Sequence, residues 1–303
     1  MSSSEPLDAG ALNMEFRPAK SLYRLHAAFM GLKDQKEETC GPYSLLKILK
    51  SLEDAPDRRI TEDELARMAG TVISEEERDV SLKFRGQDEK GMDEGTRRKF
   101  YSVPLSVSGK PEELGTSAEG LAASIALTAG RRYAVLPIPS RSGRRIQLQR
   151  RNFGRFTEML WRLLPAADIH MILNLQMNLL CSNDELRTIV DVLSFLGSGK
   201  SARRDNWRVG HFLVCCGLVR NRNVSRDGYF YLLQDTCKSR GMGGYLIQPG
   251  ERVRSALVRD DGRGGGILLI VPLGIRDVVT GEIERFLGTG LWDNGTPYIP
   301  PVL

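Results

Sequence analysis

Apolar residues recur at helical spacing through the first half of the chain and gather into continuous runs in its last third. Leu45, Leu46, Ile48, Leu49 and Leu52 form an apolar stripe, which predicts an amphipathic helix beginning near residue 40 and buried on one side. Further helices are expected near 21–31, 61–70, 117–129, 153–164, 182–195 and 250–258, several of them opened by Ser or Thr capping patterns.

Strand signals lie mostly toward the C-terminus. Residues 211–219 and 229–234 are dense in β-branched and aromatic side chains and are separated by a polar turn, which predicts a hairpin. Residues 133–138, 169–175 and 266–272 are also expected to be strands. Because helices come early and strands late, we expect an α+β fold in which an N-terminal helical half packs on a C-terminal antiparallel β-sheet.

The domain organisation follows from length and local composition. A chain of 303 residues is long enough to bury a substantial core. Residues 1–20 are polar and are expected to form a flexible N-terminal arm, and residues 21–303 a single domain. Within that domain, residues from about 84 to 165 are rich in charge, glycine and proline at first and then helical and basic, which favours an insertion.

Bulk composition excludes several classes of protein. The five cysteines are an odd number without a CxxC pair, so we expect reduced thiols and a cytoplasmic location rather than a disulfide framework. Their spacing is not that of a zinc site, and we expect neither a metal nor a cofactor. No apolar stretch approaches the roughly 18–20 residues that span a membrane.

Charge is mildly positive, at a formal +5, and concentrates in one basic stretch. Such a stretch is usually a solvated face, and here it is also a candidate surface for an acidic protein partner. Nucleic-acid binding is not expected, because only Phe153 and Phe156 are interleaved as stacking aromatics. The arginines are Arg141, Arg144, Arg145, Arg150, Arg151 and Arg155.

Three residues suggest nucleophilic chemistry. Cys40 falls in the first turn of an expected helix, where the partial positive charge of the helix N-terminus stabilises a thiolate. His211 opens one strand of the expected hairpin and Asp235 follows the other. With the turn centred near residue 223, the simplest register sets His211 beside Asp235, because 211 plus 235 is twice 223. A cysteine nucleophile needs such a base and a group that orients it.

Three segments resemble a known family. Residues 35–45, with a glutamine, polar residues and then Cys-Gly-Pro, are similar to the start of the C39-like peptidases of the papain-like cysteine protease superfamily. Residues 210–218 and 231–236 look like that family's histidine and aspartate strands. The resemblance implies a papain-like fold with Cys40 as nucleophile, His211 as general base and then acid, and Asp235 as the orienting residue. It also implies that Gln35 helps to form the oxyanion hole with the backbone N–H of Cys40.

The chain departs from that family in two ways. Gln35 lies five positions before Cys40, one fewer than is usual, so Asp34 and Gln176 are alternatives for the oxyanion position. The stretch between the cysteine and the histidine is also long, which leaves room for insertions around the cleft.

The leading hypothesis is a cysteine protease or peptide-processing hydrolase that acts on a peptide or protein through a thioester acyl-enzyme. One alternative is an acyltransferase or transpeptidase that passes the same acyl group to an amine or thiol. The other is a catalytically inactive papain-like module that binds a protein, with the arginine-rich segment as its interface.

Overall fold

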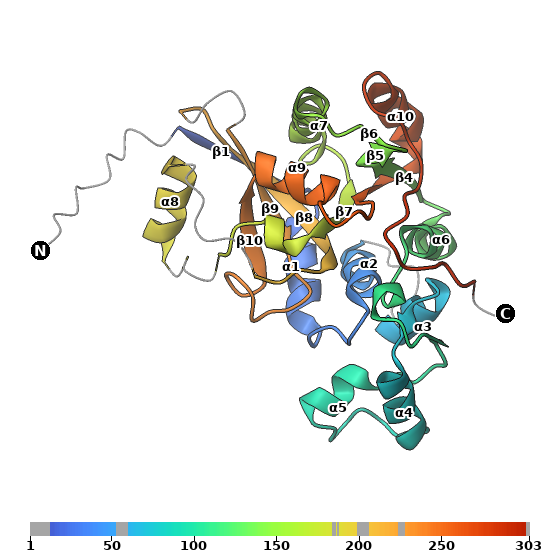
Figure 1. The fold of residues 1–303 in the computed structure, drawn as a ribbon. Coiled ribbons are helices and arrows are strands. Elements are labelled where there is room, and N and C mark those ends of the chain that lie inside the picture. The colour runs from blue at the N-terminus through green and yellow to red at the C-terminus, as the bar shows by residue number, and fades with distance from the viewer. Residues whose placement is uncertain are drawn as a thin grey trace, which may run out of the picture.

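A seven-stranded antiparallel sheet forms the centre of the computed structural model, which describes residues 13–52, 60–183, 186, 188–198, 206–223 and 228–300. The strand order is β10-β9-β8-β7-β11-β4, with β1 also paired to β8 (Figure 1). The strands are β1 (Met14–Pro18), β4 (Tyr133–Pro139), β7 (His170–Gln176), β8 (Gly210–Asn221), β9 (Tyr229–Gln234), β10 (Tyr245–Pro249) and β11 (Gly266–Pro272). Two short pairs lie outside it: β2 (Val72–Ile73) with β3 (Ser106–Val107), and β5 (Arg141–Ser142) with β6 (Arg145–Ile146).

Helices cover both faces of the sheet, which is why its central strands are continuous apolar runs. Side chains of α1, α2, α3 and α6 form a core with one face, and those of α7, α9 and α10 with the other (Figure 1). The helices are α1 (Leu22–Gly31), α2 (Cys40–Ser51), α3 (Glu62–Met68), α4 (Glu75–Lys83), α5 (Glu94–Lys99), α6 (Ala118–Ala129), α7 (Arg150–Leu163), α8 (Ile189–Ser198), α9 (Gly250–Val258) and α10 (Arg276–Glu284). Single 3₁₀ turns are η2 (Pro111–Glu113), η3 (Met177–Leu179) and η4 (Leu273–Ile275).

Local capping explains where several helices begin. Thr61 caps α3 and Ser74 caps α4, each in a reciprocal capping box with the glutamate three residues later. These starts confirm the capping patterns in the sequence. The expected start near residue 182 of the helix that becomes α8 lies partly outside the described residues, and α8 itself begins at Ile189.

The α+β class and the antiparallel sheet are confirmed, but the N-terminal arm differs from the expectation. Met14–Pro18 is not part of a loose arm, because it forms β1 along the length of β8 that β7 leaves unpaired. The first twelve residues of that arm lie outside the described part. Tyr245–Pro249 forms the edge strand β10, where no strand was expected from the sequence. The insertion expected from about 84 to 165 stays a prediction; its strand β4 pairs with β11 and its helix α7 lies in the core.

The register of the β8–β9 hairpin also differs from the simplest one. Val214 pairs with Gln234, so Asp235 falls opposite residue 213 rather than opposite His211. The shift already exists near the turn, where Arg220 pairs with Tyr229 rather than with residue 226. The β-bulge between Cys215 and Gly217 adds a residue to β8 and so reduces the shift from three positions to two. His211 and Asp235 are therefore diagonal neighbours on one face of the hairpin, a separation that long side chains bridge.

Within the described part of the chain, none of the helices is both long and apolar enough to cross a lipid bilayer.

Candidate active site

Helix α2 begins at Cys40 and carries it to the open end of the β8–β9 hairpin. Ser44 and Lys47 share the helix face of Cys40, since they follow it at positions i+4 and i+7. Ser44 Oγ donates a hydrogen bond to the Phe212 carbonyl at 3.2 Å. Gly41 permits this close approach, because a Cβ there would lie 3.4 Å or less from side-chain atoms of Leu121 and Phe212. The sequence thus fixes Cys40 next to the strand that carries His211.

Lys47 anchors the same helix to the aspartate strand. It is fully buried, and its Nζ donates to the carbonyl oxygens of Asp235 at 2.8 Å and Gln234 at 3.3 Å. The rings of Phe29 and Tyr43 flank the ammonium at 5.0 and 5.5 Å. Burial lowers the pKa of Lys47 to about 8. The cation therefore holds the backbone at Asp235 against α2.

His211 and Asp235 form a buried pair. His211 Nε2 lies 2.9 Å from Asp235 Oδ1, and the two residues are only 2 % and 0 % exposed. Asp235 Oδ1 also accepts hydrogen bonds from the backbone N–H of Thr236 at 2.6 Å and of Cys237 at 3.3 Å. Burial by itself raises the pKa of Asp235, but the His211 charge and these bonds lower it to about 2. Asp235 is thus held as an anion.

Cys40 lies close enough to His211 for its charge to raise the pKa of the imidazole. Because Asp235 engages Nε2, the ring nitrogen left for the thiol is Nδ1. Burial acts to lower the pKa of His211, but the charges of Asp235 and Cys40 outweigh it and raise the pKa to about 10. The three residues that sequence reasoning selected therefore lie together, in the order thiol, imidazole, carboxylate.

Trp207 and Arg240 cover this pair. The Trp207 ring lies 5.0 Å from the His211 ring, and the Arg240 guanidinium stacks over Trp207 at 4.5 Å. Arg240 Nε is also 3.3 Å from Asp235 Oδ2, so the aspartate is balanced by cations on two sides. This cover limits the access of water to the His211–Asp235 bond, and a drier bond is electrostatically stronger.

The backbone of Gln35 is hydrogen-bonded to Thr236, the residue after Asp235. Its backbone N–H donates to the Thr236 carbonyl at 3.4 Å, and its side-chain Oε1 is buried without a hydrogen-bond partner among the described residues. The first N–H groups of a helix also have no intrahelical acceptor, and Pro42 supplies none, so those of Cys40 and Gly41 are the donors at the start of α2. The N-cap residue Thr39 makes no side-chain cap with them.

The Thr39 hydroxyl is directed instead toward a buried charged network under the loop that precedes Cys40. Thr39 Oγ1 donates to Glu62 Oε1 at 2.5 Å, and the Lys36 N–H donates to the same oxygen at 2.8 Å. Lys36 Nζ lies 2.7 Å from Asp63 and 2.5 Å from Glu89. Because α3 supplies Glu62 and Asp63, this helix fixes the loop between Gln35 and Cys40.

We expect Glu62→Gln to flatten the pH dependence of stability. Burial raises the pKa of Glu62 from 4.5 to about 7, against the bonds from Thr39 and Lys36. The folded protein therefore binds an extra proton between pH 4.5 and 7, and this group makes the fold less stable as the pH rises through that window. Melting temperatures from pH 5 to 8 should fall more steeply in the wild type than in Glu62→Gln. Parallel curves would contradict the assignment, and the exposed Glu284→Gln should match the wild type.

The alternatives for the oxyanion position are occupied elsewhere. Asp34 Oδ1 accepts from the Lys238 N–H at 3.2 Å. Gln176 Nε2 donates to Asp260 at 2.7 Å, and its Oε1 accepts from the Asp260 N–H at 2.9 Å. Of the three candidates, only Gln35 has a buried side-chain oxygen without a hydrogen-bond partner among the described residues.

Sequence reasoning missed four residues of this site, Lys47, Thr236, Trp207 and Arg240. A lysine inside the apolar stripe of α2 is a signal that was available, because a buried cation requires partners. Thr236 Oγ1, 3.1 Å from His211 Nε2, directly follows the aspartate. Trp207 and Arg240 lie in irregular segments, and no local pattern marks them. Among the described residues, no three His, Cys, Asp or Glu side chains converge as metal ligands.

The chain belongs to a family of unknown function, DUF6885, whose profile matches residues 19–293. A search of the curated proteins finds no match to the chain.

Proposed function

We propose that this member of the family is a cysteine-dependent acyl-transfer enzyme, and specifically a papain-like peptidase that hydrolyses peptide bonds. The observation that carries the proposal is the grouping of Cys40, His211 and Asp235 at the junction of a helix start and a strand end, with His211 hydrogen-bonded to Asp235 and close enough to Cys40 to interact with its charge. Such a series supplies a nucleophile, a base within reach of it, and a group that orients the base.

In the first half-reaction, Cys40 Sγ attacks the carbonyl carbon of the substrate after its proton passes to His211. The carbonyl oxygen becomes an oxyanion, which the N–H of Cys40 and the side-chain amide of Gln35 stabilise. His211 then gives its proton to the nitrogen of the scissile bond, and the amine leaves. What remains is a thioester on Cys40 and a neutral imidazole.

In the second half-reaction, His211 takes a proton from a water molecule, and the hydroxide attacks the thioester carbonyl. The carbon–sulfur bond breaks, the sulfur receives the proton back from His211, and a carboxylic acid is released. Asp235 stays ionised throughout, because its pKa is held near 2. Its charge is what makes a protonated His211 favourable beside a thiolate in a buried place.

Selective alkylation of the thiol tests this proposal. Cys40 and Cys237 are both partly exposed, whereas Cys215 and Cys216 are buried, so Cys237 is a matched control for access. At pH 7 we expect iodoacetamide to modify Cys40 at least about tenfold faster than Cys237, because only Cys40 lies beside an imidazolium. Peptide mass spectrometry after short exposures measures the two rates. Equal rates would overturn the proposal.

Isotope incorporation identifies the acyl acceptor. Peptide mixtures digested in H₂¹⁸O should acquire ¹⁸O at each new C-terminal carboxylate if water attacks the thioester. Amide products formed with an added primary amine, without ¹⁸O, would instead assign an acyltransferase.

A further inference from the structure

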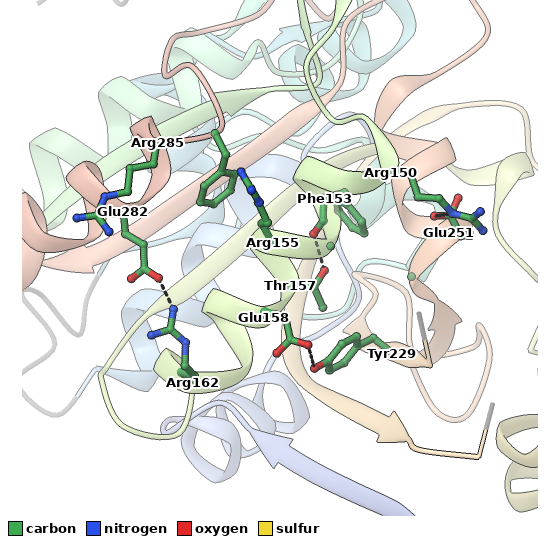
Figure 2. A pocket seen from close by; sticks show the side chains of 13 residues that line it. Arg150, Phe153, Arg155, Thr157, Glu158, Arg162, Tyr229, Glu251, Glu282 and Arg285 are labelled. Atoms are coloured by element: carbon green, nitrogen blue, oxygen red, sulfur yellow. Dashed lines mark hydrogen bonds and ion pairs between the residues drawn. The ribbon is translucent and has the colours of Figure 1, made fainter. Parts of the chain in front are cut away.

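A groove of about 770 Å³ lies on the opposite face of the sheet from α2. Helix α7 forms one wall, the end of α10 forms the other, and the starts of β9 and α9 close one end (Figure 2). Its volume is within the range of sites for small organic molecules. Cys40 and His211 do not line it, so the groove is separate from the candidate active site.

Each of the three glutamates that line the groove already has a partner. The pairs are Arg150 with Glu251 at 3.1 Å, Glu158 with the Tyr229 hydroxyl at 2.7 Å, and Arg162 with Glu282. The negative charges of these carboxylates are therefore already paired with groups of the protein.

Arg155 and Arg285 differ from the other two arginines. Both line the groove and are exposed, and within the described part of the chain neither has a carboxylate or hydrogen-bond acceptor. Figure 2 shows them on opposite sides, Arg155 on α7 and Arg285 at the end of α10. A planar guanidinium fork favours carboxylate, phosphate or sulfonate oxygens.

The lining between these arginines is apolar and recessed. Phe153 and Phe286 contribute aromatic surface, and Gly154 lies between Phe153 and Arg155 on α7. A Cβ at Gly154 would meet nothing within 4 Å, so packing does not require a glycine there. A glycine inside a helix costs about 1 kcal/mol relative to alanine. What the missing side chain provides is open space over the aromatic floor.

We propose that this groove binds a small organic anion, whose acidic group contacts Arg155 and is further balanced in charge by Arg285 on the opposite side, and whose apolar body lies over Gly154 against Phe153 and Phe286. An acidic protein partner for the whole basic stretch stays a prediction. At one end of the basic stretch, Arg141 donates to the Val258 and Arg259 carbonyls at the end of α9. At the other end, Arg155 lines the groove and has no acceptor among the described residues.

The fluorescent anion 8-anilinonaphthalene-1-sulfonate has this chemistry and serves as the probe. We expect saturable binding of one molecule per chain, weakened at least about tenfold in Arg155→Gln/Arg285→Gln and weakened further by added salt. Gly154→Leu should block binding without lowering the melting temperature, since its side chain enters open space and leucine favours the helix. The exposed neighbour Arg151→Gln is the matched control and should bind like the wild type.

Two further ligands separate the sources of affinity. N-phenyl-1-naphthylamine has the apolar body without the sulfonate, and inorganic phosphate has an acidic group without the body; each should bind more weakly than the probe. Unchanged probe affinity in the arginine and Gly154 variants would overturn the proposal, as would equal affinity for N-phenyl-1-naphthylamine. Binding of an acidic peptide but not of the probe would assign the groove to a protein partner instead. Cys40 alkylation is measured separately, so failure here leaves the proposed activity standing.

Discussion

Replacing Cys40 with alanine is expected to lower the rate of peptide-bond cleavage by at least about 1,000-fold. Without the sulfur no thioester forms. The only reaction left is direct attack of an unactivated water on the substrate carbonyl, with the N–H groups at the start of α2 stabilising the oxyanion. The change removes one atom from a partly exposed side chain, so the melting temperature should stay close to that of the wild type. Cleavage of a peptide substrate found in the isotope experiment, followed by chromatography, measures the loss.

A double variant sharpens this test. If Cys40 and His211 act as one unit, then Cys40→Ala/His211→Ala should be no slower than Cys40→Ala alone, because the second change removes a base with nothing left to activate. Two losses that multiply would show that the residues act independently. Cys237→Ala should keep full activity, since its sulfur pairs with Ser239 Oγ at 3.0 Å and is not bonded to His211. Full activity in Cys40→Ala would rule out the mechanism.

Much of the fold was predictable because its elements carry their own signals. The strands β7, β8, β9 and β11 are apolar runs, and α3 and α4 begin at capping boxes. Strands β1 and β10 lack such signals. β1 is a five-residue segment without a buried residue, and it exists as a strand only because β8 extends past the end of β7. That opportunity is a property of the assembled sheet and not of residues 14–18.

The candidate site was predictable to the level of residue types and order, but not of geometry. Counting from a turn centred near residue 223 misplaces the register, because Arg220 already pairs with Tyr229 on the turn side of the bulge, and residues 224–226 of that turn lie outside the described part. The pairing of His211 with Asp235 holds in spite of the shifted register because the two remain on one face. Lys47 was not considered in the sequence analysis, although its charge is what joins α2 to Asp235.

The groove could not be predicted at all. Its lining comes from α7, β9, α9 and α10, which are far apart in the sequence, and pairing decides which arginines are uncommitted. Arg150 and Arg155 look alike in a basic stretch. Only the folded chain distinguishes the one bound to Glu251 from the one that faces open space.

Replacing Asp235 with asparagine should change the charge of the site with little change in its shape. The pKa of His211 is raised to about 10 because the Asp235 and Cys40 charges outweigh burial. Of these two charges, that of Asp235 has the larger effect on the pKa of His211. Asparagine removes it, so the pKa should fall and the imidazolium should lose its proton at a lower pH. At pH 7 we expect cleavage to slow by about 100-fold. Without the carboxylate, the His211 ring is held less firmly and its protonated form is less stable, so it is a poorer general acid and base.

Two alkylating reagents of different charge measure the protonation state of His211 through the reactivity of Cys40. Negatively charged iodoacetate is attracted by a protonated His211, whereas neutral iodoacetamide is not, so the ratio of their rates at Cys40 reports the imidazolium. In the wild type the ratio should stay high up to about pH 10 and then drop, and in Asp235→Asn the drop should come at least one pH unit earlier. Asp277→Asn, at a side chain that is 86 % exposed, is the matched control and should leave the profile unchanged. A ratio near one in the wild type at pH 7 would show that Cys40 has no charged partner, and identical profiles in the wild type and Asp235→Asn would show that this carboxylate does not set the charge of His211.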